Sequence, residues 1–91
     1  MSHNKHGKSE HLVTIDVDRK GDGTHATASL RWHDVDLVGV GDAQLEDGER
    51  YPKRVGEELA VARALTHLTR QLFVTTAGDI ESVTGESISI R

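Results

Sequence analysis

The stretch VGEELAVARALTHLTRQLFVT, residues 55–75, is the one long segment of this chain with helical apolar periodicity. Large aliphatic residues recur at spacings of four, three and four, as an amphipathic helix on a core requires. They are Val61, Leu65, Leu68 and Leu72, and the stripe is widened by Val55, Leu59, Ala62 and Phe73. The segment predicts one long helix around which the rest of the chain is organised.

The opposite side of this helix carries a basic row. Arg63, His67 and Arg70 stand at i, i+4 and i+7, which places them along one line on the solvent side. No carboxylate lies three or four positions from any of them, and Lys53 and Arg54 stand near the start of the helix. These five residues are the candidate RNA- or partner-binding site. The alternatives are a solvated face, or a surface that meets carboxylates across a dimer.

Three segments before the helix have the period-two alternation of half-buried strands. They are residues 11–18, 25–33 and 37–45, with polar turns predicted at residues 18–24 and 33–36. In the second segment the apolar face is formed by Ala26, Ala28, Leu30 and Trp32. The residues predicted to contact the core or a second subunit are Trp32, Leu30, Val38 and Val40.

Two glycines, Gly39 and Gly41, fall inside the third predicted strand. Glycine in a strand interior weakens the strand and often marks a bulge or a close approach of another backbone. A helix that crosses the sheet here, or a strand from a second subunit, would explain both positions.

The predicted helix begins soon after Pro52, with Glu57 and Glu58 in its first turn. We expect it to end before Gly78, since threonines precede that glycine and glycine is favoured just past a helix end. Asp79 then predicts the N-cap of a short second helix that stops at Gly85. Residues 86–91 are interpreted as a short strand or a frayed end.

The composition bounds the class of protein. Ninety-one residues, 35% hydrophobic and 29% charged, predict a single domain over residues 11–85, with a flexible arm at 1–10 and a tail at 86–91. No stretch has transmembrane length, and the polar N-terminus predicts no signal peptide, so we expect a cytoplasmic protein. The net charge of -4 disfavours an indiscriminate nucleic-acid binder.

The residues that could carry chemistry do not form a known pattern. The chain has no cysteine, no glycine-rich phosphate loop and no nucleophile motif, so we expect no enzyme, no cofactor and no small-molecule substrate. His3, His6 and His11 lie close together in the sequence. A mobile arm lacks the surrounding groups that orient metal ligands, so we expect no metal site.

The segments LRWHDVDLVGVGDAQL and VGEELAVARALTHLTRQLF, with the DIESVTG stretch after them, carry a family resemblance. Over about residues 12–85 the chain resembles a small, mostly actinobacterial family of unknown function, domain of unknown function 1876, described as having a fold like the double-stranded-RNA-binding domain (dsRBD). The resemblance implies an α+β fold with a three-stranded antiparallel sheet and the long helix on one face. It also implies a homodimer, a likeness in shape to ribosome hibernation-promoting factors, and a role in stress or dormancy.

Two departures from the RNA-binding module are visible in the sequence. That module contacts phosphates through a lysine cluster at the start of its last helix, where this chain has only Lys53 and Arg54. Its first helix, which reads the minor groove, is missing here. We therefore hypothesise a non-catalytic homodimer that binds the ribosome or structured RNA. The alternative is a homodimeric protein-interaction module that binds no nucleic acid.

Overall fold

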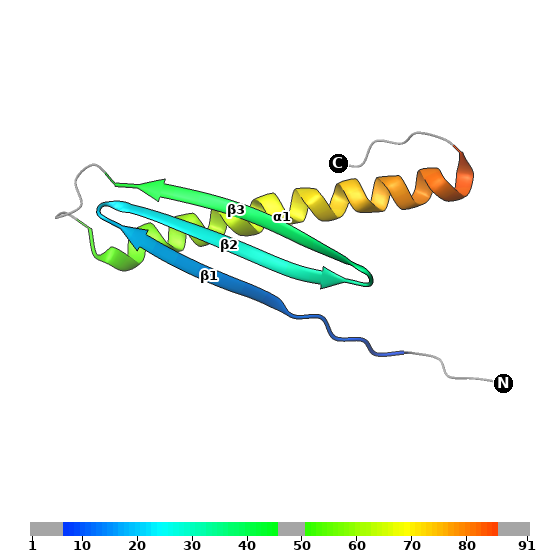
Figure 1. Cartoon of the computed structure of the whole chain (residues 1–91), viewed down its shortest axis with the longest axis horizontal. Coiled ribbons are helices and arrows are strands. Elements are labelled where there is room, and N and C mark those ends of the chain that lie inside the picture. The colour runs from blue at the N-terminus through cyan, green and yellow to red at the C-terminus, as the bar shows by residue number, and fades with distance from the viewer. Residues whose placement is uncertain (1–6, 46–50, 86–91) are drawn as a thin grey trace.

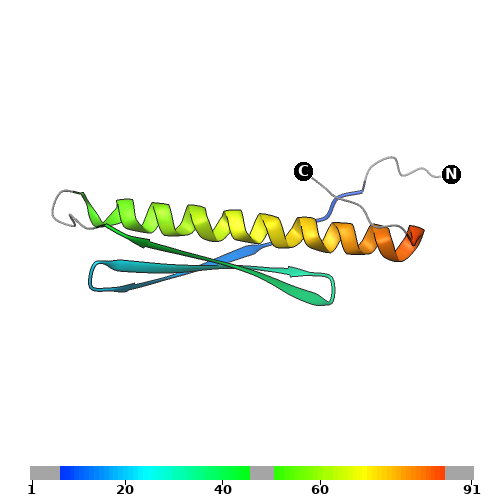
Figure 2. The same cartoon turned by 90° about the horizontal axis from the view of Figure 1, so that it is seen from above.

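The computed structural model describes residues 7–45 and 51–85, which form three strands followed by one helix. The strands are β1 (Val13–Lys20), β2 (Gly23–Trp32) and β3 (Val35–Gln44), and the helix is α1 (Lys53–Thr84). The sheet is antiparallel in the order β1-β2-β3 (Figure 1). The helix runs along one face of it, so the protein has two layers (Figure 2). The predicted α+β fold is confirmed at this level.

The strands are joined by two-residue turns at the predicted places. Gly21, in the first turn, has a φ of 61°, and His33, in the second, has a φ of 53°. Such positive φ values suit the tight turns that match the twist of paired strands. All three predicted strands exist, with ends that differ by about two residues. The acidic connection at 46–50, the tail at 86–91 and residues 1–6 of the predicted arm lie outside the described residues.

The helix is longer than predicted, and the prediction of a second, short helix is wrong. α1 continues through Gly78 to Thr84 and is the only helix in the described part of the chain. The threonines expected to end it instead donate their hydroxyls to the carbonyls one turn back, Thr75 to Gln71 and Thr76 to Leu72. The helix stops at Gly85, whose φ of 76° gives the left-handed cap that glycine favours. At its other end α1 begins at Lys53, so Glu57 and Glu58 lie beyond its first turn and not within it as predicted.

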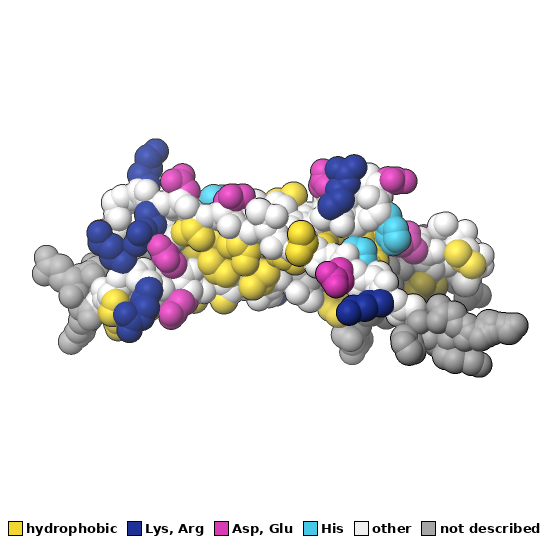
Figure 3. All heavy atoms as spheres, turned by 90° about the horizontal axis from the view of Figure 1, so that it is seen from below, with side chains coloured by type: hydrophobic (Ala, Val, Ile, Leu, Met, Phe, Trp, Pro, Cys, Tyr) yellow, Lys and Arg dark blue, Asp and Glu magenta, His cyan; other side chains and the backbone are white. Residues whose placement is uncertain are grey.

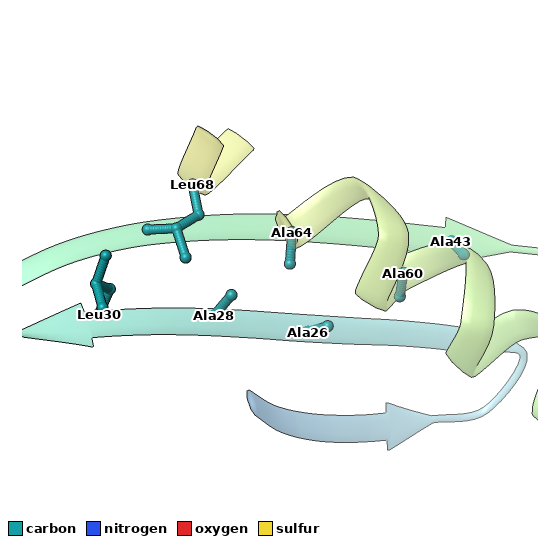
Figure 4. Packing of buried hydrophobic residues seen from close by; sticks show 7 residues of the cluster. All are labelled: Ala26, Ala28, Leu30, Ala43, Ala60, Ala64 and Leu68. Carbon is teal, nitrogen blue, oxygen red and sulfur yellow. The ribbon is translucent and has the colours of Figure 1, made fainter. Parts of the chain in front are cut away.

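The core between α1 and the sheet consists largely of small residues (Figure 4). It comprises Ala26, Ala28, Leu30, Ala43, Ala60, Ala64 and Leu68. No side chain larger than alanine in the described residues is less than 2% exposed. Because burial of a large aliphatic side chain contributes about 1.5–3 kcal/mol and of alanine much less, this core supplies only a modest hydrophobic free energy.

The two strand glycines lie where the helix crosses the sheet. A Cβ atom at Gly39 would overlap the backbone of Ala64 and Leu68, and one at Gly41 would overlap the backbone of Ala60 and Ala64. Of the two explanations left open by the sequence, the crossing helix is confirmed.

The predicted apolar stripe coincides with the buried face of the helix only at Leu68. The residues that face the sheet are Gly56, Ala60, Ala64 and Leu68, spaced four apart. Leu65 is 37% exposed, and Val61 and Leu72 are half-buried. Where α1 crosses Gly39 and Gly41, its backbone is too close to the sheet for large side chains to stand between them. Except for Leu68, the larger residues of the predicted stripe therefore lie on a flank of α1.

Candidate functional site

The helix covers β2 and β3 and leaves β1 largely uncovered. Every residue of β1 is exposed, although β2 has four buried positions and β3 three. The two free edges of the sheet, at β1 and at β3, are therefore in different environments.

Side chains of α1 bond to the outer edge of β3. The Arg63 guanidinium donates to the carbonyl oxygen of Asp42 at 2.7 Å. The N–H of Val40 donates to Nδ1 of His67 at 2.9 Å. Unpaired strand edges are templates for pairing with another chain, so these two bonds protect part of the β3 edge.

The ring of His67 is held from both sides. Its Nε2 lies 2.9 Å from the side-chain Nε2 of Gln71. Because Nδ1 accepts from the N–H of Val40, the neutral ring carries its proton on Nε2. Nε2 donates that proton to the side-chain oxygen of Gln71 once the oxygen and nitrogen of the Gln71 amide are exchanged. This arrangement fixes the tautomer of His67 and gives the ring a structural role.

The predicted binding residues are therefore in two places. Arg63 and His67 lie along β3, so they do not form the free solvent-side row that the helix spacing suggested. Arg70 is exposed, and Lys53 and Arg54 are exposed in the first turn of α1. None of these last three pairs with a carboxylate of another described residue. Binding of RNA or of a partner by the five residues stays a prediction.

An apolar patch lies between β1 and the flank of α1. Val13, Ile15 and Val17 pair with Leu30, Ala28 and Ala26, so their side chains lie on the helix side of the sheet. They are nevertheless 44%, 41% and 41% exposed. We name them, with Val61 and Leu65 of α1, the β1–α1 patch.

The flank of α1 that meets β1 is located by an ion pair. Arg19 of β1 and Glu57 of α1 are 3.3 Å apart, and Val61 and Leu65 follow Glu57 at helical intervals of four. Figure 3 shows hydrophobic side chains gathered in the middle of this side of the molecule, with charged side chains at both ends. An apolar centre with a charged rim is typical of a protein–protein interface.

The predicted core or dimer residues divide between the two faces of the sheet. Leu30 is buried and Trp32 is half-buried against the core. Val38 and Val40 are 41% and 42% exposed and lie on the face opposite the helix, so they are not core residues. Their contact with a second subunit stays a prediction.

Aromatic rings meet at the turn between β2 and β3. The ring of His11 lies 4.5 Å from that of Trp32, centroid to centroid, and Trp32 lies 4.9 Å from His33. His11 stands two residues before Val13, and Trp32 two residues after its partner Leu30, so this contact continues the β1–β2 ladder. The ring of His11 is therefore packed beside the sheet, although β1 itself begins at Val13.

One line of polar side chains on the open face of the sheet has the order of an acyl-transfer triad. Nδ1 of His25 bonds to Oδ1 of Asp42 at 2.7 Å, and Oγ1 of Thr27 lies 3.5 Å from Nε2 of His25. All three side chains project from a strand surface, and His25 and Asp42 line an open hollow of about 340 Å³. The His25–Asp42 pair was missed in the sequence because it depends on strand register.

Metal-binding groups do not converge in the described residues. Among positions 7–45 and 51–85, no three His, Asp or Glu side chains are placed to hold an ion. His3 and His6, the other members of the predicted histidine cluster, lie outside the described residues. Nor is α1, the one helix described, long and apolar enough to cross a membrane.

The fold and these surfaces define a class of small α+β proteins, with one long helix packed on a three-stranded antiparallel sheet. Comparison with known proteins places the chain more narrowly. The model of the Rv2632c-like family matches residues 9–89, and the chain belongs to that family. The expected membership of a small family with relatives of unknown function is borne out to this extent.

The relatives are uncharacterised mycobacterial proteins. Mb1767 of Mycobacterium bovis is 43% identical over 72 residues, covering 79% of this chain and 77% of the relative. Rv2632c of Mycobacterium tuberculosis is 36% identical over 86 residues, covering 89% and 92%. The crystal structure of Rv2632c superposes with a TM-score of 0.85 at 35% identity, covering 91% of this chain and 99% of that one.

Proposed function

We propose that this protein is a non-catalytic binding protein that self-associates and works through protein–protein contacts. The observation that carries the proposal is the β1–α1 patch. Apolar side chains that point to the helix side of a sheet are normally covered by the helix, yet here three of them stay more than 40% exposed. A covering surface from a second copy would complete this layer.

The small core supports the same proposal. Leu30 and Leu68 are the only buried residues larger than alanine among the apolar residues of the described core. Small domains with little buried apolar area commonly gain stability from oligomerisation. Association through the patch would add the burial that α1 alone does not provide.

The absence of catalysis is part of the proposal. The Thr27–His25–Asp42 line is exposed, and its Thr–His distance of 3.5 Å is at the limit of a hydrogen bond. Acyl transfer also needs donors aimed at the developing oxyanion, and an open strand surface provides no enclosed place for them. We therefore expect the His25–Asp42 pair to join neighbouring strands, not to activate a nucleophile.

Light scattering at micromolar concentration tests the proposal. We expect a mass twice the 10.0 kDa of the chain. Ile15→Lys places a charge in the β1–α1 patch and should yield monomer. Val38→Lys is the matched control, because Val38 is also a β-branched strand residue with 41% exposure but lies on the opposite face. A monomeric parent protein would refute self-association, and loss of the dimer in the Val38 variant alone would move the interface to the other face.

A second candidate function, association with the ribosome or structured RNA under stress or dormancy, has one observation in its favour. Lys53 and Arg54 begin α1, and the Arg19–Glu57 ion pair brings the end of β1, with Lys20, to the same end of the molecule. Figure 3 shows Lys and Arg side chains gathered at that end. The likeness to the dsRBD fold and to hibernation factors supports this candidate. Asp and Glu side chains lie among the basic side chains at this end, and their negative charge weakens the second candidate.

Sedimentation of lysate from stationary-phase cells in a sucrose gradient at low salt tests the second candidate. Binding through about four phosphates would weaken as roughly the 0.9 × 4 power of salt concentration on a duplex. A double variant, Lys53→Glu with Arg54→Glu, should abolish such binding. The variant Arg63→Glu with Arg70→Glu tests the predicted row separately. A protein that remains at the top of the gradient would eliminate this candidate.

A further inference from the structure

Main-chain groups on the outer edge of β1 have no partner among the residues that the structure describes. Val40 directs its N–H away from β2 and towards α1, so Thr27 opposite it directs its groups to Asp16 of β1. Main-chain groups alternate in direction along a strand, so Ile15 and Val17, on either side of Asp16, point outwards. In the described part of the chain nothing bonds to these outward groups.

The β1 and β3 edges therefore differ in how open their main-chain groups are to pairing with another chain. The β3 edge is partly closed by Arg63 and His67, whereas β1 is eight residues long with neither proline nor a bulge. Proteins usually blunt exposed edge strands because such strands pair with other chains. The β1 edge also borders the apolar patch.

We infer that β1 pairs antiparallel with β1 of a second copy, with Ile15 opposite Ile15, to form a continuous six-stranded sheet. The inference rests on the self-association proposed above and adds the strand edge that pairs and its register. Both helices then lie on the same face, and Val13 of each copy lies beside Val17 of the other. The exposed residues of the two patches meet in one apolar surface.

The charges of β1 select this register. With Ile15 opposite Ile15, Asp16 faces Thr14. Continuation of the pairing into the residues before β1, which begins at Val13, places Asp18 opposite Leu12 and Lys20 opposite Glu10. No carboxylate then lies directly opposite another, and the Lys20–Glu10 pair of opposite charges forms twice, once at each end of the contact. Opposite charges across a strand pair stabilise it and like charges destabilise it.

The neighbouring registers are unfavourable. A shift of two residues one way puts Asp18 opposite Glu10 and Lys20 opposite Lys8 of the second copy. A shift of two the other way puts Asp16 opposite Asp16. A shift of one residue would set outward main-chain groups against inward ones, so it breaks the hydrogen-bond pattern.

The size of the surface suits such a dimer. The protein exposes 7162 Å², and a stable interface of standard size buries about 800 Å² on each partner, about one ninth of that area. The edge of β1, the two residues that precede it and the patch together run along one side of the sheet. A C2 axis through Ile15 makes this contact closed, so it does not continue into a fibre.

Cysteine pairs test the register, because the natural chain has no cysteine. Residues directly opposite in a hydrogen-bonded pair have Cα atoms about 5.5 Å apart, within the usual disulfide range. Ile15→Cys should therefore cross-link to itself when oxidised with copper phenanthroline. Val13→Cys alone and Val17→Cys alone should not, because each is displaced from its own copy by about 14 Å along the strand. A mixture of the Val13 and Val17 variants should cross-link.

The outcomes separate the two proposals. Cross-linking of Ile15→Cys and of the mixture, without cross-linking of either single valine variant, supports the register. A dimer by light scattering whose Ile15→Cys form stays uncross-linked overturns the β1 pairing and leaves self-association standing. Equal cross-linking of all three single variants overturns the register. A monomeric parent protein overturns both.

Discussion

Replacing Gly39 by alanine should destabilise the protein far more than one methyl group normally does. The added Cβ would overlap the carbonyl oxygen of Ala64 and the nitrogen of Leu68, and would lie 2.8 Å from Cα of Leu68. Ordinary carbon–carbon contacts are about 3.5–4.0 Å. All three atoms belong to the helix backbone, so no side chain can rotate to relieve the overlap. α1 must move away from β3 by about 1 Å.

This movement would weaken the contacts that depend on the close approach of α1 to the sheet. Ala60 and Ala64, both fully buried, would lose contact with the strands, and the Arg63 and His67 bonds to β3 would lengthen. Overpacking of this kind typically costs 1–3 kcal/mol and occasionally more. We expect Gly39→Ala to lower the free energy of unfolding by about 3 kcal/mol, out of a total of about 5–15 kcal/mol for a domain. At 4–8 °C per kcal/mol for a domain of this size, Tm should fall by about 12–24 °C.

Urea and thermal unfolding, followed by circular dichroism at one fixed protein concentration, would measure this change. Fixed concentration is necessary because association stabilises the folded state by mass action. Gly78→Ala is the matched control, because nothing lies within 4 Å of a Cβ built there. We expect that variant to gain up to about 1 kcal/mol from helix propensity. A Gly39 variant within about 0.5 kcal/mol of the parent would show that the close helix–sheet contact is wrong.

Three further changes have defined outcomes. Replacing Arg63 by Met and His67 by Leu together should cost about 1–2 kcal/mol by loss of two hydrogen bonds, and should increase aggregation in a turbidity assay because the β3 edge is exposed; unchanged aggregation would contradict the edge-protecting role. His11→Ala should shift the emission of Trp32, the one tryptophan, to longer wavelength; an unaltered spectrum would argue against the ring contact. Gly85→Ala should lower the unfolding free energy by about 1 kcal/mol, because the left-handed cap is strained for alanine; equal stability in urea would refute this.

Periodicity was sufficient to predict the three strands and the long helix that follows them. Alternation located all three strands, and the two strand glycines correctly indicated a close backbone approach at β3. The same signal misplaced the helix face, because it gives weight to large residues such as Leu65. The surface that packs on the sheet is marked by small residues instead, at Gly56, Ala60 and Ala64. That spacing was visible in the sequence, and its match to Gly39 and Gly41 could have been recognised.

The end of the helix and the edges of the sheet were less accessible to sequence reasoning. Thr75 and Thr76 have poor helix propensity, yet their hydroxyl bonds to the preceding turn are compatible with a continuing helix. The contacts of His67 with Val40 and of Arg63 with Asp42 depend on how far along β3 the helix lies. Nothing local in the sequence fixes that distance, so the basic row was interpreted as free.

The glycine- and alanine-lined contact has a consequence for how α1 is positioned along its own axis. Large interlocking side chains usually set the axial position of a packed helix, but Gly56, Ala60 and Ala64 repeat every four residues and present nearly the same profile after a shift of four residues, about 6 Å. The bonds of Arg63 and His67 to β3 do not repeat in this way. Together with Leu68, the one large buried side chain of the row, they act as positional markers that distinguish one setting of the helix from the next, so polar groups at the margin reinforce what a nearly repetitive interior fixes only weakly.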